Sequence, residues 1–226
     1  DLVIIKKTFE DRGIGTLETV PGAAGGVQYI SIAGNDDVLD FVHTLCNRIA
    51  EPNRLLPGGY LYLSDLLGEP VTLKAIGKIL ATKFNNQKID AIMTVATKGI
   101  PIAQAVAEHL SVPFVIVRRD SKVTEGSTVS INYVSGSSKR IEKMELSKRS
   151  LAEGSNVVIV DDFMKAGGTI NGMKNLLEEF NAHLVGIGVL VESEYAEERL
   201  VDDYVSLVKI KNVNMKEKQI EVVDGN

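Results

Sequence analysis

The sequence predicts an α/β fold, in which a parallel sheet with helical crossovers follows a small helix-and-hairpin module. Three observations predict it. From residue 66 onward, short apolar runs alternate with helical segments of about ten residues. Residues 157–160 form a run of branched apolar side chains that leads straight into two acids and a loop with two glycines. Ahead of residue 34, a helical pattern precedes two alternating segments joined by a loop of small residues.

Length and composition indicate a globular protein. The chain has 226 residues and a mass of 24.5 kDa, which suits one large domain or a small domain joined to a medium one. Its hydrophobic content is 44% and its charged content is 24%, as expected of a soluble chain. No apolar run approaches the roughly 18 residues of a membrane helix, and no signal peptide is seen. A single cysteine, Cys46, suits a reducing compartment, so we expect a cytoplasmic protein without a membrane partner.

Charge and histidine content narrow the expected ligands. The net charge of −5 weakly disfavours nucleic acid, yet residues 118–149 carry eight basic and four acidic side chains, which concentrates positive charge locally. The three histidines, His43, His109 and His183, are scattered and lack metal-ligand spacing, so we expect no metal bound by the chain alone. The sequence begins with Asp1 inside a predicted helix, so we expect residues upstream of it in the complete protein.

Residues 1–33 form the first predicted domain. Apolar side chains at helical spacing predict a helix over residues 1–12, and residues 15–20 and 27–32 then alternate as the strands of a hairpin. A helix that feeds a two-stranded hairpin is also the second half of a winged-helix DNA-binding module. The alternative is an ordinary helix and hairpin that bind no DNA. The candidate DNA contacts are basic side chains of the helix and residues of the hairpin tip, namely Lys6, Lys7, Pro21, Gly22, Ala23, Ala24, Gly25 and Gly26.

Residues 34–226 form the second predicted domain, with the joint near residue 34. Acids near the start and Arg48 near the end favour a helix over residues 36–50, and the aromatic side chains in residues 60–63 alternate as in a short strand. Helices are then predicted over residues 71–84, 100–110, 170–180 and 197–201, and strands over residues 91–95, 114–117, 157–160, 184–191 and 205–210. Strands separated by helices run parallel, and the ligands of such sheets bind at the carboxyl ends of the strands.

Two acids and two glycines stand at one of these strand ends. Asp161 and Asp162 follow the strand of residues 157–160, and Gly167 and Gly168 precede the next helix. A helix start behind small residues leaves backbone N–H groups free and favours an anion such as phosphate. Carboxylates do not bind phosphate, so we expect the acids to face sugar hydroxyls, or a metal that bridges to a pyrophosphate. The implied ligand is a sugar phosphate with a diol; the alternative is an ordinary junction whose acids cap the helix.

A second loop of this kind follows another strand. Residues 96–99 join the strand of residues 91–95 to a helix, and Lys98 could neutralise a phosphate as a point charge. The alternative is a routine turn between a strand and a helix.

Residues 118–149 form a long insertion between two predicted strands. They are too long and too regular for a simple connection, and they predict a hairpin around residues 135–138. A mobile, basic flap of this kind could exclude water from a phosphate site and clamp the ligand. The alternative is a surface hairpin that makes a dimer contact, and both interpretations can hold together.

The stretch VVIVDDFMKAGGT, residues 157–169, resembles the phosphoribosyl pyrophosphate (PRPP) motif of the type I phosphoribosyltransferases. The resemblance implies a phosphoribosyltransferase-like, Rossmann-like domain with a hood and a flexible flap. It implies that Asp161 and Asp162 hold the ribose hydroxyls, and that Mg²⁺ enters through these acids together with PRPP. It assigns the 5′-phosphate to Phe163, Met164, Lys165, Ala166, Gly167, Gly168 and Thr169, and the pyrophosphate to Ala96, Thr97, Lys98 and Gly99. The candidate contacts from the flap or to a base are Tyr60, Arg118, Arg119 and Lys122.

The chain as a whole resembles the purine operon repressors of Gram-positive bacteria. The segments that carry this resemblance are GIGTLETVPGAAGG, LLPGGYLYLSDLLG, MTVATKGIP, KVTEGSTVSINYVSGSS and VDDFMKAGGTINGM. It implies a homodimeric repressor of purine biosynthesis and transport genes, in which a partial winged-helix domain precedes the effector domain. It further implies operator DNA as a partner, PRPP as the inducer that releases DNA, and guanosine tetraphosphate as a competing corepressor.

The resemblance to the repressors implies a pocket that binds PRPP without consuming it, and therefore no enzymatic activity. The transferase motif usually has Thr or Ser where this chain has Lys165 and Ala166, and that departure suits binding alone. Phe163 or Tyr60 could stack on the purine ring of a nucleotide effector. The alternative function is a purine phosphoribosyltransferase for xanthine, guanine or hypoxanthine, which the acid pair and both phosphate loops would also suit.

Overall fold

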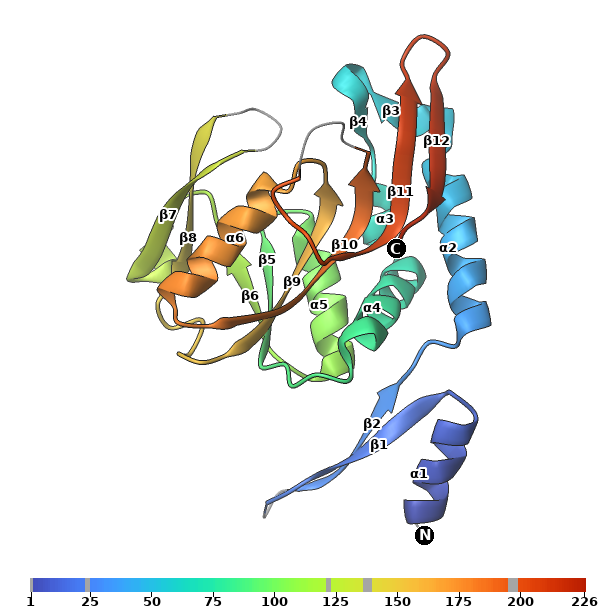
Figure 1. Ribbon diagram of the computed structural model, residues 1–226, viewed down its shortest axis with the longest axis vertical. Helices are drawn as coiled ribbons and strands as arrows, with labels where there is room; N and C mark the ends of the chain where they lie inside the picture. The colour runs from blue at the N-terminus through green and yellow to red at the C-terminus, as the bar shows by residue number, and fades with distance from the viewer. Residues whose placement is uncertain (1, 23–24, 121–122, 136–139, 195–198) are drawn as a thin grey trace.

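The computed structural model describes residues 2–22, 25–120, 123–135, 140–194 and 199–226 (Figure 1). Its N-terminal part consists of helix α1 (Leu2–Asp11) and an antiparallel hairpin of β1 (Gly15–Val20) and β2 (Gly26–Ser31). In Figure 1 this part projects from one end of a larger α/β body. The helix and the hairpin expected from the sequence are present, although Ala23 and Ala24 at the expected tip lie outside the described residues.

A six-stranded sheet, in the order β12-β11-β10-β9-β5-β6, forms the centre of the larger body. Its parallel strands are β5 (Ala91–Val95), β6 (Phe114–Val117), β9 (Asn156–Met164), β10 (His183–Ser193) and β11 (Val205–Asn214). The edge strand β12 (Gln219–Asp224) pairs antiparallel with β11. The predicted parallel sheet is therefore confirmed, with an antiparallel strand added at one edge.

Helices cover the sheet and enclose two hydrophobic cores. They are α2 (Asn35–Ile49), α3 (Ser64–Gly68), α4 (Pro70–Phe84), α5 (Gly99–Leu110) and α6 (Gly168–Glu179). Val158 and Val160 of β9 belong to the core that α2 to α5 share, whereas Val157 and Ile159 belong to the core beneath α6. All four side chains are fully buried. Burial on both faces of β9 explains why this run is apolar at every position.

Two small hairpins stand beside the sheet. The hood comprises the short 3-10 turns η1 (Pro52–Arg54) and η2 (Pro57–Gly59) with strands β3 (Leu55–Leu56) and β4 (Tyr60–Leu61). The flap comprises β7 (Thr128–Val134) and β8 (Ile141–Ser147), preceded by the 3-10 turn η3 (Val123–Glu125). The flap has the predicted antiparallel pairing, and its expected tip falls within residues 135–138, of which only Ser135 is described.

Several strands differ in extent from the expectation. The strand expected over residues 157–160 runs on to Met164, because Asp161 and Phe163 remain paired with Val189 and Val191 of β10. The strand expected over residues 60–63 is reduced to two residues, since β4 has only the equally short β3 as a partner. The strand expected to be the last, residues 205–210, extends to Asn214 and turns back into β12.

Two helices also differ from the expectation. The short helix α3 was not anticipated, and it precedes α4 directly because Pro70 begins the second helix. Of the helix expected over residues 197–201, residues 199–201 are not helical and the remainder lies outside the described part of the chain. No helix in the described residues is both long and apolar enough to cross a membrane.

The N-terminal part meets the larger body at residues 32–34. The Ala33 N–H donates a hydrogen bond to the Thr82 hydroxyl of α4 at 3.1 Å, and Ala33 is buried in the core that contains α4. The domain boundary near residue 34 falls between β2 and α2 in the chain, and its role as a boundary stays a prediction.

Candidate functional site

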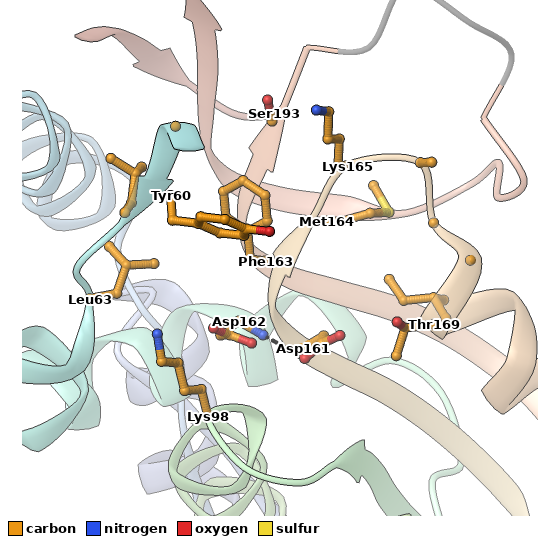
Figure 2. Close-up of a pocket in the computed structure, with 16 residues that line it drawn as sticks. Tyr60, Leu63, Lys98, Asp161, Asp162, Phe163, Met164, Lys165, Thr169 and Ser193 are labelled. Atoms are coloured by element: carbon orange, nitrogen blue, oxygen red, sulfur yellow. Dashed lines mark hydrogen bonds between the residues drawn. The ribbon is translucent and has the colours of Figure 1, made fainter. Parts of the chain in front are cut away.

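A cavity of about 470 Å³ lies at the carboxyl ends of the central strands (Figure 2). The hood, the loop before α5, the end of β10 and the turn from β9 into α6 enclose it. Its lining residues are Gly59, Tyr60, Leu61, Leu63, Lys98, Ser193 and residues 161–170. The predicted acid pair, the predicted phosphate loop, Lys98 and Tyr60 therefore meet in one pocket.

Asp161 and Asp162 line this pocket near the end of β9 (Figure 2). Asp161 is 5% exposed, and one of its carboxylate oxygens accepts a hydrogen bond from the Asp162 N–H at 2.9 Å. Burial and the charge of Asp162 raise the pKa of Asp161 well above its ordinary value. Burial also raises the pKa of Asp162, although Asp161 and Lys98 oppose that rise. The pair therefore favours a ligand that supplies hydrogen-bond donors or positive charge, such as a diol or a metal ion.

The loop of residues 165–169 presents a helix N-terminus to the same pocket. Gly167 has a φ of 82°, a left-handed conformation that favours glycine, and this turn brings the chain from β9 into α6. The first N–H groups of α6 lack partners within the helix, and the helix dipole makes this end positive. Lys165 is exposed beside the loop and adds a positive charge. This arrangement suits a phosphate group.

The loop of residues 96–99 reaches the pocket from the start of α5. The Ala96–Thr97 peptide bond is cis, and Lys98 directly precedes the first residue of α5. Lys98 lines the cavity, whereas Ala96, Thr97 and Gly99 are not among its lining residues. Of the four residues predicted to hold a pyrophosphate, the structure thus brings only Lys98 to the surface of the cavity.

Gly99 fixes how closely this loop approaches the acid pair. A Cβ at this position would overlap the Thr94 hydroxyl and lie 3.2 Å from a carboxylate oxygen of Asp161. Any larger residue would therefore push the loop away from β5 and β9. The Thr94 side chain is fully buried, and its hydroxyl has no hydrogen-bond partner among the described residues.

The arginines at the base of the flap are engaged by carboxylates. Arg118 Nε lies 3.1 Å from a Glu125 oxygen, and Arg119 Nε lies 3.7 Å from a Glu142 oxygen. Neither arginine is among the lining residues of the cavity. The third predicted contact, Lys122, lies outside the described residues. The structure therefore does not bring Arg118 or Arg119 to the surface of the cavity.

The flap is nevertheless anchored to the helix that carries the phosphate loop. Tyr133 is buried, and its hydroxyl donates to a Glu142 carboxylate oxygen at 2.8 Å. Burial and the Glu142 hydrogen bond raise the pKa of Tyr133 to about 12. Gly172 of α6 faces the ring, since a Cβ there would lie 2.9 Å from Tyr133 Cγ. The flap thus packs directly on α6, the helix that begins at the phosphate loop.

Sequence reasoning missed several lining residues. Leu61 belongs to the hood, Leu63 lies just after it, and Ser193 is the last residue of β10. Ser193 could have been found, because it ends the strand that the sequence places directly after the β9–α6 unit. The hood leucines carried no such signal, since nothing in a short apolar segment indicates which cavity it covers.

The predicted DNA contacts lie on an exposed part of the molecule. No residue of α1 is buried, and Lys6 and Lys7 are both exposed. Lys6 Nζ lies 3.9 Å from a Glu10 oxygen one turn along the helix. The described residues of the predicted hairpin tip, Pro21, Gly22, Gly25 and Gly26, are exposed as well.

No group of three or more histidine, cysteine, aspartate or glutamate residues is placed to hold a metal ion in the part of the chain that the structure describes. Cys46 is a buried free thiol near Asp224, and burial raises its pKa to about 12. A thiol of this kind is protonated and unreactive at neutral pH.

Two family models match the chain. Residues 63–223 match the phosphoribosyl transferase domain, and residues 1–31 match the N-terminal domain of the bacterial purine repressor. The first match lies in the larger α/β body, after α2 and the hood, and the second spans the N-terminal helix and hairpin.

Curated relatives match the chain over its full length. The chain is 63% identical to the purine biosynthesis transcriptional repressor PurR of Bacillus subtilis, and it covers 79% of that protein. It is 52% identical to the purine biosynthesis transcriptional activator PurR of Lactococcus lactis, of which it covers 83%. Among solved structures, an adenine phosphoribosyltransferase from Thermoanaerobacter pseudethanolicus superposes with a TM-score of 0.61 at 23% identity, over 74% of this chain and 98% of that one. The last match concerns the fold alone.

Proposed function

The chain belongs to the PurR family of purine-biosynthesis transcriptional regulators, and on that premise we propose that it binds operator DNA and senses PRPP in the pocket below the hood. One observation carries the proposal. The acid pair, a helix N-terminus and Lys98 line a single cavity, so the groups that suit a diol and those that suit phosphates face the same space. PRPP combines these features in one molecule.

Each part of PRPP has a matching part of the pocket. The ribose hydroxyls would donate to Asp161 and Asp162, and the 5′-phosphate would accept from the N–H groups and the hydroxyl of residues 165–169. The pyrophosphate would lie against Lys98 and the loop of residues 96–99. Mg²⁺ prefers oxygen ligands, so the carboxylates could hold it in company with the pyrophosphate oxygens.

Purine nucleotides are the second class of proposed effector. Tyr60 and Phe163 both line the cavity, and an aromatic ring suits stacking on a purine. Guanosine tetraphosphate would compete with PRPP because it combines a purine and ribose with pyrophosphate groups. Alanine at Phe163 should weaken nucleotide binding more than PRPP binding, as measured by calorimetry. Equal losses for both ligands would argue against stacking.

DNA binding is assigned to the N-terminal part. The basic side chains of α1 would contact phosphates of operator DNA, and the hairpin tip would reach an adjacent groove. We favour repression over activation, because the identity to the named repressor, 63%, exceeds the 52% identity to the named activator. We further propose that the chain acts as a homodimer. PRPP would then act as the inducer that releases DNA.

Substitution of the acid pair tests the proposal. Asp161→Ala and Asp162→Ala should leave operator binding intact and abolish its relief by PRPP. The measurement is a titration of the DNA complex with PRPP, with and without Mg²⁺. A variant that still released DNA at the wild-type PRPP concentration would contradict the assignment.

An enzymatic function is the second candidate, because the phosphoribosyl transferase match spans both phosphate loops and the acid pair. Incubation with PRPP, Mg²⁺ and hypoxanthine, guanine or xanthine, followed by measurement of the nucleotide formed, distinguishes an enzyme from a sensor. Turnover on the order of 1 per second or faster would support a transferase. Under the sensor proposal, PRPP is recovered intact.

A further inference from the structure

A buried ionic cluster lies behind the phosphate loop, outside the cavity itself. Glu192 of β10 is 3% exposed, and its carboxylate accepts hydrogen bonds from Tyr204 at 2.7 Å and from Ser206 at 2.9 Å. It also accepts a hydrogen bond from Arg199, whose guanidinium stacks on the Tyr204 ring. Burial raises the pKa of Glu192, but these three donors outweigh burial and hold it below its ordinary value. Glu192 is therefore an ionised, fully satisfied carboxylate.

Arg199 also holds the backbone at the end of β10. Its second guanidinium nitrogen donates to the carbonyl oxygen of Ser193 at 2.6 Å, so the end of β10 is tied to residue 199. Ser193 is itself a lining residue of the cavity (Figure 2). The cluster thus fixes residue 199 against the end of β10.

The residues that follow Arg199 lie directly on the phosphate loop. The Leu200 N–H donates to the Ala166 carbonyl oxygen at 3.0 Å. Val201 is 1% exposed and packs against Gly167, where a Cβ would lie 2.9 Å from Val201 Cγ2. One backbone hydrogen bond and one tight apolar contact therefore hold the loop through Leu200 and Val201, which do not line the cavity.

We infer that Arg199, clamped by Glu192 and Tyr204, is a positioning residue for the 5′-phosphate loop. It touches no ligand, but it fixes residues 200–201, and these fix Ala166 and Gly167. The orientation of the loop N–H groups then depends on a guanidinium more than thirty positions away in the sequence. The inference rests on the proposed function, and it adds that affinity for the 5′-phosphate is set from outside the pocket.

Separate titrations of the two ends of the ligand test this inference. Arg199→Ala should weaken ribose 5-phosphate binding by about tenfold, the lower end of the effect of removing an outer partner from a bound ion. Binding of pyrophosphate with Mg²⁺ should be unchanged, since under the proposal it depends on Lys98 and not on the 5′-phosphate loop. Both affinities are measured by calorimetry on the intact chain.

Two further variants separate positioning from general stability. Val201→Ala keeps the ionic cluster but removes the contact with Gly167, so it should also weaken ribose 5-phosphate selectively. Arg48→Ala removes a more exposed ion pair, to Glu69 at 2.7 Å, whose residues do not line the cavity, and it should leave both affinities unchanged. If Arg199→Ala does not fold, as judged by its melting curve, Val201→Ala carries the test.

The outcomes are distinguishable. Equal loss of both ligands in the positioning variants, or loss of neither, overturns the inference while the proposed function stands. Failure of the wild-type protein to bind either compound removes the proposed function, and the inference with it.

Discussion

Asp161 and Asp162 place two carboxylates side by side where water is largely excluded. The sequence could predict this pair and its chemistry, because adjacent acids at the end of an apolar run are a local pattern. It could not predict the burial. Hood and loops from distant parts of the chain enclose the pair, and burial is what raises both pKa values.

The raised pKa of Asp161 predicts a specific pH dependence. Its pKa in the unfolded chain is about 3.9, so between that value and the raised folded value the folded protein binds more protons than the unfolded one. Stability therefore falls as the pH rises through this window. Asp161→Asn removes the titrating group and should stabilise the ligand-free protein more at pH 8 than at pH 5.

Urea unfolding in metal-free buffer at these two pH values measures the effect. Asp65→Asn serves as the control, because hydrogen bonds from Arg54 lower the pKa of Asp65 and its substitution should destabilise at both pH values. An Asp161→Asn variant with the same advantage at pH 5 and pH 8 would show that the group does not titrate as stated.

At the scale of elements, the positions of strands buried on both faces could be predicted from the sequence, whereas those of edge elements could not. Residues 157–160 are apolar throughout because each face of β9 meets a core. The end of β9 was misplaced because Asp161 breaks the apolar run, while its backbone still pairs with Val189. β12 was missed because its position depends in part on α2, which contacts it from far along the chain.

The crossing of α4 and α5 depends on one glycine. A Cβ at Gly77 would lie 2.5 Å from Ala105 Cβ and 2.8 Å from its carbonyl oxygen. Because backbone cannot move aside as a side chain does, Gly77→Ala should destabilise by about 1–3 kcal/mol despite the better helix propensity of alanine. Gly68→Ala, with open space around its Cβ, should be close to neutral in the same urea-unfolding measurement.

The hood is held by an ion pair that predicts a ligand-selective defect. Arg54 is buried and donates to both carboxylate oxygens of Asp65, at 2.7 and 2.8 Å. Asp65 is partly exposed, so Asp65→Ala should lower stability by only about 1 kcal/mol. The released hood should weaken nucleotide binding at Tyr60 more than ribose 5-phosphate binding, as measured by calorimetry. An equal loss for both ligands would indicate damage beyond the hood.

For the whole molecule, the proposed function requires that an occupied pocket alter the proposed DNA surface in the N-terminal part. The described residues include a contact between the N-terminal part and the larger body. The Ala33 N–H donates a hydrogen bond to the Thr82 hydroxyl of α4 at 3.1 Å. α4 in turn packs beneath β10, where the ring of Phe84 faces Gly186 and Gly188. β10 ends at Ser193 in the cavity, so a continuous packed path joins the pocket to the joint.

Thermodynamic linkage predicts a symmetric effect along this path. If PRPP lowers operator affinity by some factor, operator DNA must lower PRPP affinity by the same factor, typically about 5–150-fold. Both titrations should be made at one fixed salt concentration, because DNA affinity falls steeply with salt. Unequal factors would show that one titration had not reached equilibrium, whereas a factor of one in both titrations would contradict the proposed sensing of PRPP.

Thr82→Val tests whether the joint carries the coupling. The substitution keeps the shape of the side chain, but removes the hydroxyl that accepts from Ala33. We expect the coupling factor to fall toward one while PRPP affinity in the absence of DNA is unchanged. Thr72→Val on the same helix removes a buried hydroxyl that bonds Glu69 instead, and it should leave the coupling at the wild-type value. If both variants retain full coupling, the signal passes between the two parts by another contact.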